Sequence, residues 1–167
     1  MSAGSRFVLD SNVFIEASQS YYSFDLFPPF WAMLLTQHAS GRLFSIDRIK
    51  DELVQIGDRL CDWAKDECPE SFFVPTTDPK VVRLFGDMMN WVQADPQFTQ
   101  AAKAEFATVA DGWVVAYAKA NGLKVATHEV YAPNIRKRVK IPNVCVEFSV
   151  DYCNTFEMLQ ELGVKFS

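Results

Sequence analysis

The chain has 167 residues, of which 49% are hydrophobic and 14% aromatic, and its formal net charge is −5. The length suits one domain with a sizeable core, and the composition excludes an intrinsically disordered chain. The negative charge excludes a protein that coats nucleic acid through bulk positive charge, although it is compatible with a local basic patch. We therefore predict a single domain over residues 1–167.

The cysteines and the first residues limit the class of protein further. The 4 cysteines form no Cys-x-x-Cys pair and the 2 histidines are scattered, which excludes a zinc-finger pattern. The first apolar run is too short for a signal peptide, and no apolar segment approaches the ~20 residues that span a bilayer. We expect a cytoplasmic protein with reduced thiols and no membrane association.

A short apolar run at residues 7–9, Phe-Val-Leu, ends abruptly in three polar residues. The run lacks polar alternation, which predicts a parallel strand buried on both faces and a helix from about Val13. Asp10 would then lie at the carboxyl end of the strand, where ligands of open α/β sheets bind. The alternative is that Asp10, Ser11 or Asn12 only caps the helix.

Residues 21–31 are dense in aromatic side chains and contain a Pro-Pro pair. The prolines predict a new helix from about Pro29, which Gly41 would end. Most of these aromatic side chains are expected in the core. The alternative is a groove for a partner protein or the contact face of a homodimer.

Residues 43–46 predict a second strand, and Asp47 is expected to cap a helix that runs to about Asp66. Glu52 lies at the edge of the apolar stripe of this helix. A bound cation would offset the cost of burying this carboxylate. The alternative is a side chain that reaches past the stripe to water or to Arg48.

The middle of the chain predicts a third strand at residues 72–75, at the sheet edge because it contains proline, and a helix over 78–92. A long helical pattern follows over residues 99–120. Asp111 projects from a face of small residues in this pattern, and Gly112 beside it indicates a break into two helices or a close approach.

Residues 124–127 predict a fourth strand, and Glu129 follows its carboxyl end. A basic run comes soon after. Its members are Arg136, Lys137, Arg138 and Lys140. A solvated face is the usual meaning of such a run, but beside acids that could hold a metal we favour a flank that binds phosphate.

The last elements are less distinct. Residues 142–148 are compatible with a helix or a strand. A weak strand is predicted at residues 151–153, and a closing helix begins with a capping-box pattern at Asn154 and stops at Gly163.

Four acids of this β-α-β alternation lie at positions that can face the same edge of the sheet. Asp10 and Glu129 end strands, whereas Glu52 and Asp111 lie on buried helix faces, so all four can converge at one edge of a parallel sheet. Carboxylates without a histidine cluster suit Mg²⁺ or Mn²⁺ rather than zinc. Such a site activates water and clamps phosphate oxygens during phosphodiester hydrolysis. No glycine-rich nucleotide-binding loop is present.

Four segments resemble the acidic motifs of PIN-domain ribonucleases. They are residues 8–14, 51–53, 109–113 and 125–129. The resemblance covers nearly the whole chain and points to a bacterial PIN-like subfamily related to VapC-type toxins. It implies a PIN-like three-layer α/β/α fold with a central, mostly parallel sheet of roughly four to five short strands.

The resemblance also implies a function, an endoribonuclease that needs Mg²⁺ or Mn²⁺ and hydrolyses RNA. The catalytic and metal-binding positions that it implies are Asp10, Glu52, Asp111 and Glu129. Asn12 resembles the residue that supports the first acid, and the basic run would hold the RNA backbone. The kinship with toxins implies a cognate antitoxin. This chain departs from the family pattern in having His128-Glu129 where an Asp commonly follows Thr.

Two other classes of protein fit parts of the pattern. A phosphatase of the haloacid-dehalogenase type also has an Asp after its first strand, but it needs a second Asp two residues later, where this chain has Asn12. The second alternative is a PIN-like module that has lost catalysis and binds RNA or a protein partner.

Overall fold

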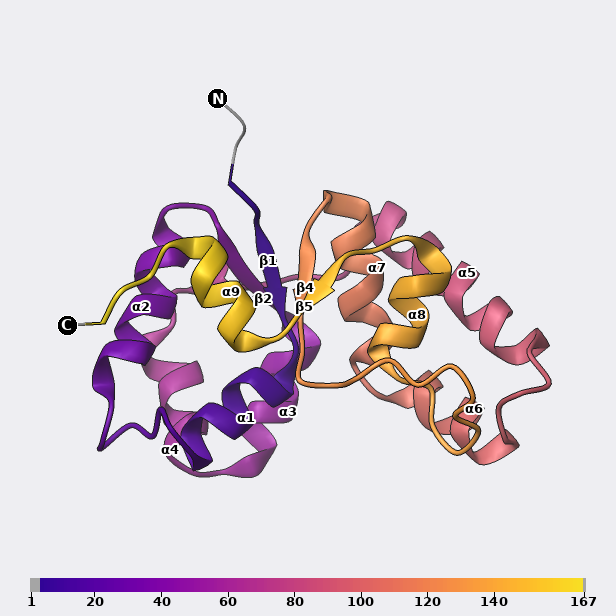
Figure 1. The fold of residues 1–167 in the computed structure, drawn as a ribbon, viewed down its shortest axis with the longest axis horizontal. Coiled ribbons are helices and arrows are strands. Elements are labelled where there is room, and N and C mark those ends of the chain that lie inside the picture. The colour runs from indigo at the N-terminus through magenta and orange to yellow at the C-terminus, as the bar shows by residue number, and fades with distance from the viewer. Residues whose placement is uncertain (1–3, 167) are drawn as a thin grey trace.

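The computed structural model describes residues 4–166 and shows a 5-stranded, all-parallel sheet between two layers of helices (Figure 1). The strand order is β3-β2-β1-β4-β5. The strands are β1 (Phe7–Leu9), β2 (Leu43–Ile46), β3 (Phe73–Val74), β4 (Lys124–Ala126) and β5 (Tyr152–Cys153). The prediction of a PIN-like α/β/α fold with a parallel sheet is therefore confirmed.

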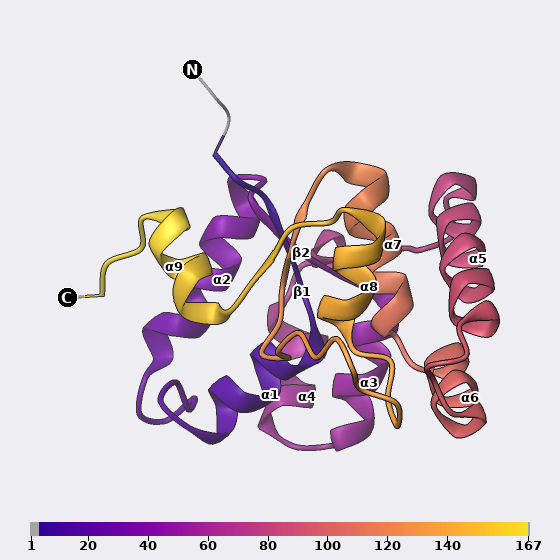
Figure 2. The ribbon, with the colours of Figure 1, turned by 45° about the vertical axis from the view of Figure 1, so that its right-hand side comes forward.

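Two groups of helices cover the two faces of the sheet, and the turned view in Figure 2 shows the same division. The first group comprises α1 (Ser11–Gln19), α2 (Pro28–Ala39), α4 (Arg59–Asp62) and α9 (Thr155–Leu162). The second comprises α5 (Pro79–Ala94), α6 (Gln100–Thr108), α7 (Asp111–Asn121) and α8 (Ile141–Phe148). Helix α3 (Asp47–Ile56) starts directly after the carboxyl end of β2.

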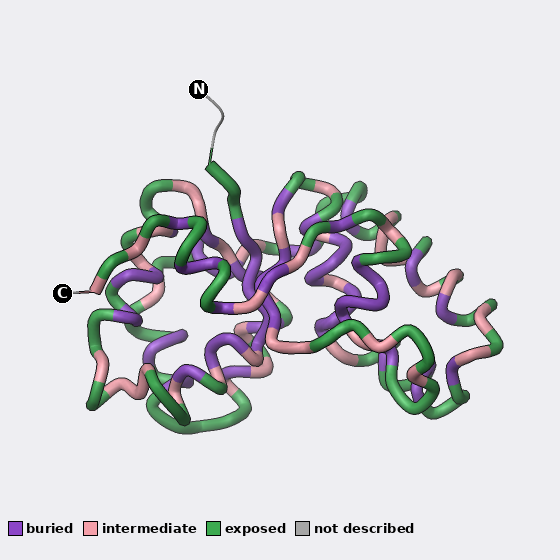
Figure 3. The backbone as a smooth tube through the Cα atoms, in the orientation of Figure 1, coloured by how far each residue is buried: buried purple, intermediate pink, exposed green. Residues whose placement is uncertain are grey.

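The core lies along the strands, which are the most continuously buried part of the tube in Figure 3. Phe7, Val8 and Leu9 of the central strand β1 have no exposed surface. Helices cover both faces of β1, so each of its positions faces apolar side chains and the strand needs no polar alternation. Asp10, the polar residue after this strand, therefore lies at the edge of the sheet formed by the carboxyl ends of the strands.

The prediction of one helix over residues 47–66 is wrong, because the helix ends at Ile56 and Gly57 follows as its C-cap. Gly57 adopts a left-handed conformation with φ 70°, and the side chain of Asp58 accepts the Leu60 N–H to cap α4. A π-helical turn, η1 (Trp63–Glu67), follows α4, and a 3₁₀ turn, η2 (Glu70–Phe72), precedes β3.

Asp47 is the first residue of α3 and not its N-cap, which corrects a second detail of the prediction. Its carboxylate accepts hydrogen bonds from the Thr76 N–H (3.2 Å) and hydroxyl (2.9 Å). These bonds tie the start of α3 to the segment after β3.

The structure decides two alternatives that the sequence leaves open. The pattern over residues 99–120 is divided into α6 and α7, and residues 142–148, which fit a helix or a strand, lie in helix α8. Asn154 and Glu157 form the predicted capping box of α9. Helix α1 begins at Ser11, slightly earlier than expected, with Asp10 as its N-cap.

Most aromatic side chains of residues 21–31 pack in the interior or against it. Phe24 stacks on Trp31 at 3.9 Å between ring centroids, and Tyr22 stacks on Phe30 at 4.5 Å. Tyr21 remains 78% exposed. Among the helices of residues 4–166, none combines the length and apolar character needed to cross a bilayer.

Candidate functional site

Asp10 lies at the carboxyl end of β1 and also caps helix α1. It is 2% exposed, and its Oδ1 accepts the Ser11 N–H at 2.8 Å. Its Oδ2 accepts a hydrogen bond at 3.1 Å from the hydroxyl of Thr127, the residue that follows β4. The two interpretations of Asp10, helix cap and site residue, are therefore compatible with one position.

Glu129 is brought to Asp10 by Thr127. The Thr127 hydroxyl, which donates to Asp10, accepts the Glu129 N–H at 3.2 Å. Oε2 of Glu129 accepts the Ile141 N–H at 2.9 Å, while the buried Oε1 receives no hydrogen bond from any of residues 4–166. Thr127 thus links the acids that follow β1 and β4.

Glu52 reaches from α3 to the start of α7. Oε1 of half-buried Glu52 accepts the N–H of Ala110, at 3.3 Å, and Asp111 is the next residue. Gly112 permits a close approach of α7 to α6, because a Cβ atom at this position would lie 2.8 Å from Cζ of Phe106. The four predicted acids therefore come together from four separate segments.

The carboxylates of the site influence one another electrostatically. Burial raises the pKa of Asp10 to about 7, with a further increase from the charge of Glu129. Burial likewise raises the pKa of Asp111 to about 8, and the charges of Asp10 and Glu129 add to the effect. The site therefore holds more negative charge than its surroundings stabilise.

Arg138 is the positive partner of two of these acids. Its Nη2 lies 3.0 Å from Oε1 of Glu129 and 3.9 Å from Oδ2 of Asp111. With the guanidinium in this place, no three His, Cys, Asp or Glu side chains within residues 4–166 are arranged to share a metal ion. The all-carboxylate set still has the chemistry that suits Mg²⁺ or Mn²⁺, and within residues 4–166 the buried Glu129 Oε1 contacts Arg138 but accepts no hydrogen bond.

His128 points away from the four acids. Its Nδ1 lies 3.2 Å from Oε2 of Glu16 on α1, and its Nε2 lies 2.7 Å from the Thr155 hydroxyl on α9. The chain bends at His128, so Glu129 enters the site while His128 joins two helices.

The hydrogen bonds to Asp10 come from Ser11 and Thr127, and the supporting role of Asn12 stays a prediction. Thr127 is a site residue that the sequence analysis did not single out. The signal that could have identified it is its position. Ala126 pairs with Leu9, so the polar residues that follow them, Thr127 and Asp10, lie side by side.

The basic run is divided between two environments. Arg136 and Lys137 are exposed, whereas Arg138 contacts the acids. Lys140 is half-buried and its Nζ donates to the Val130 carbonyl at 3.3 Å. A role of this run in RNA binding stays a prediction.

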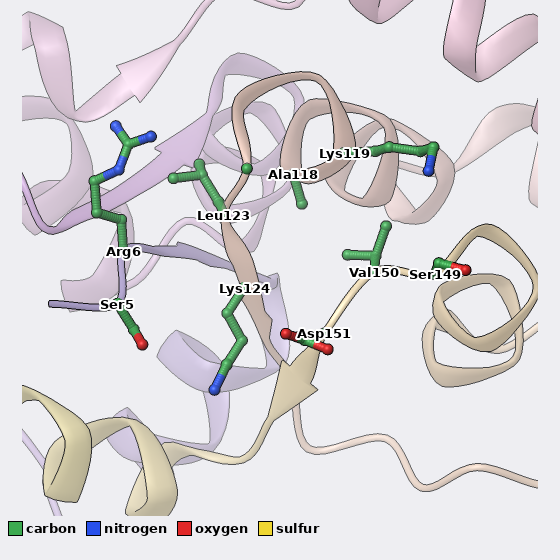
Figure 4. A pocket seen from close by; sticks show the side chains of 10 residues that line it. Ser5, Arg6, Ala118, Lys119, Leu123, Lys124, Ser149, Val150 and Asp151 are labelled. Carbon is green, nitrogen blue, oxygen red and sulfur yellow. The ribbon is translucent and has the colours of Figure 1, made fainter. Parts of the chain in front are cut away.

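A separate hollow of about 300 Å³ lies beside the amino ends of β1 and β4, away from the four acids (Figure 4). Figure 4 shows that Arg6, Lys119 and Lys124 at its rim point apart. Lys119 Nζ donates to a backbone carbonyl at 2.7 Å, and Lys124 pairs with Glu161 at 2.7 Å. These cations do not converge on one ligand position.

Comparison with known proteins identifies the family. The family model described as "Domain of unknown function (DUF4411)" matches residues 7–166. No curated protein sequence matches the chain. A solved structure of FitAB bound to the IR36 DNA fragment is similar, with a TM-score of 0.53 and 14% identity over 89% of this chain and 94% of that chain. This similarity shows a shared fold, in agreement with the predicted PIN-like architecture, and the chain belongs to the DUF4411 family.

Proposed function

We propose that this protein is a divalent-metal-dependent endoribonuclease that hydrolyses RNA phosphodiester bonds. The observation that supports the proposal is the meeting of Asp10, Glu52, Asp111 and Glu129 at one edge of a parallel sheet, where burial and mutual repulsion raise the pKa of two of them. Buried carboxylates that repel one another are costly unless a cation pairs with them.

Asp10 and Asp111 are the best candidates for direct metal ligands because burial raises the pKa of both, so a bound cation would relieve the cost of their charges. Glu129 would contribute Oε1, and Glu52 would complete the ligand set or orient water. A bound Mg²⁺ or Mn²⁺ would supply an activated water and neutralise charge on the phosphate. Thr127 and the Ser11 N–H hold Asp10 in a fixed orientation, which reduces the reorganisation needed on binding.

The substrate and partner proposals depend on exposed surface near the acids. Arg136 and Lys137 are exposed on the same loop as Arg138 and could contact an RNA backbone. The PIN-like family and the resemblance to VapC-type toxins support a toxin of a toxin–antitoxin pair, with an antitoxin that covers the acidic site. The exposed Tyr21 and Leu26 offer apolar surface for an antitoxin or for a second copy of the chain.

Cleavage of labelled single-stranded RNA and DNA with Mg²⁺ or Mn²⁺ tests the activity, and DNA is included because FitAB is solved with DNA. We expect Asp10→Asn and Asp111→Asn to lower cleavage by at least ~100-fold, since residues that only support metal ligands already contribute roughly 10–100-fold. Asp51→Asn is the matched control, because Asp51 is exposed on α3 beside Glu52. Equal metal-dependent cleavage by the wild type and Asp10→Asn would refute the assignment.

A catalytically inactive PIN-like module is the second candidate, and the position of Arg138 among the acids favours it. A permanent guanidinium there would satisfy Glu129 and Asp111 without a metal. Calorimetric titration of Mn²⁺ separates the two functions. Binding that is lost in the Asp10→Asn/Asp111→Asn double variant supports the nuclease, whereas no binding at millimolar Mn²⁺ supports the module.

A further inference from the structure

Arg138 forms an ion pair with an oxygen of Glu129 that accepts no hydrogen bond. Within residues 4–166 this buried oxygen, Oε1, has no hydrogen-bond donor, whereas Oε2 accepts the Ile141 N–H. Nη2 of Arg138 lies 3.0 Å from this Oε1 and also within 3.9 Å of Asp111 Oδ2. The guanidinium therefore stands at the oxygens that the proposed function assigns to a metal.

The backbone around Arg138 is held in place, whereas its side chain is half-exposed and contacts the acids at its tip. Val139 is 3% exposed, and the Arg136 carbonyl accepts the Thr99 N–H at 3.0 Å. The Arg138 side chain is 49% exposed. In Figure 2 the segment that carries it runs from the end of β4 to the start of α8. The guanidinium can thus leave the acids by side-chain rotation while the backbone keeps its position.

A guanidinium and a divalent cation at these oxygens would weaken each other's binding. Both would lie at contact distance from Glu129 Oε1, where like charges repel strongly in a partly buried site. A hard divalent cation also needs carboxylate oxygens that are free to enter its ligand shell. Competition between the two cations accounts for four converging acids without a shared ligand geometry in the described residues.

We propose that Arg138 is an intramolecular counter-ion of the acidic site and competes with the divalent cation for Glu129 and Asp111. The inference rests on the proposed function, because it requires the metal site. Metal binding displaces the guanidinium to the rim of the site. There its fork of N–H donors matches the phosphate oxygens of a nucleic acid.

The test is calorimetric titration of Mn²⁺ into wild type, Arg138→Ala, Arg138→Gln and Arg136→Ala at one pH and one ionic strength. Thermal unfolding of each variant checks that it is folded, and Arg138→Gln provides a second variant of similar length. Removal of Arg138 should tighten Mn²⁺ binding roughly three- to tenfold, as expected for the loss of a half-exposed ion pair. Arg136→Ala removes an exposed positive charge from the same loop and should change the affinity by less than about twofold.

The outcomes separate this inference from the proposed function. Tighter binding in both Arg138 variants than in Arg136→Ala supports the competition, and so does binding that is detectable only without Arg138. Equal or weaker binding without Arg138, with clear binding by wild type, overturns the competition and leaves the metal site intact. No binding by any variant overturns the metal site and the competition together.

Discussion

Replacement of Asp10 by Asn should stabilise the metal-free protein above pH 7. Burial, and secondarily the charge of Glu129, raise the pKa of Asp10 from the ordinary value of 3.8 to about 7. Asn has nearly the same size and is an equally good helix cap, so its Oδ1 can still accept the Ser11 N–H, while its Nδ2 would donate to the Thr127 hydroxyl from which Asp10 accepts. The substitution therefore removes the buried charge and leaves the start of α1 capped.

The sign and size of this change in the free energy of unfolding follow from the binding of a proton to Asp10. The folded protein holds the Asp10 proton to higher pH than the unfolded chain, so the stabilisation is complete below about pH 4 and is lost as the pH rises through about 7. The rise of the Asp10 pKa from 3.8 to about 7 corresponds to at most ~4 kcal/mol in the free energy of unfolding. Because Asp111 titrates together with Asp10 and readjusts when Asp10 is neutral, we expect a gain of about 2–3 kcal/mol at pH 8.

Thermal unfolding followed by circular dichroism, in a chelator and between pH 5 and pH 8.5, measures this gain. For a chain of this length the Tm of Asp10→Asn should exceed that of the wild type by roughly 5–10 °C at pH 8. The difference should shrink as the pH falls toward 5. Asp51→Asn, at an exposed position on α3, should leave the Tm unchanged. An Asp10→Asn protein no more stable than wild type at pH 8, or a difference independent of pH, would refute the reasoning.

Two further substitutions test the packing around the site. Gly112→Ala should lower the free energy of unfolding in urea by about 1–3 kcal/mol, because a methyl group would lie 2.8 Å from Phe106 and 2.9 Å from Phe85. Gly86→Ala, in a helix with nothing within 4 Å of the new methyl, should be neutral or stabilising, and equal losses at both positions would contradict the packing argument. His128→Gln should cost about 1 kcal/mol in the same assay and leave the calorimetric Mn²⁺ affinity unchanged, whereas a tenfold weaker affinity would place His128 in the metal site.

The fold could be predicted wherever a local signal and the tertiary structure agree. Residues 43–46 form a strand with the predicted bounds, since β-branched and aromatic side chains there are also buried by helices. The break at Gly57 was missed because the apolar stripe of Ile56 and Leu60 continues across it. Gly57 followed by Asp58 was nevertheless a sufficient signal, since glycine commonly ends a helix and aspartate commonly starts one.

The site was only partly predictable. The acids that follow β1 and β4 converge because the carboxyl ends of parallel strands meet at one edge of the sheet, a rule that needs no side-chain detail. The place of Arg138 depends instead on the path of the segment between β4 and α8. That segment is irregular, and its path is set by contacts such as the Asn143 side chain, which donates to the Ala132 carbonyl at 2.8 Å and accepts the Ala132 N–H. No periodicity in the sequence encodes such contacts.

Helix capping alone does not account for Asp10, because Asn would cap α1 equally well without a buried charge. A cation would account for the charge, and Mn²⁺ at 100 times its Kd should add ~2.7 kcal/mol to the wild type. This is close to the gain expected for Asp10→Asn without metal. Saturating Mn²⁺ should therefore bring the Tm of the wild type level with that of Asp10→Asn, or above it. A wild type that gains nothing from Mn²⁺ while the variant stays more stable would favour a positively charged macromolecular partner as the group that neutralises these acids.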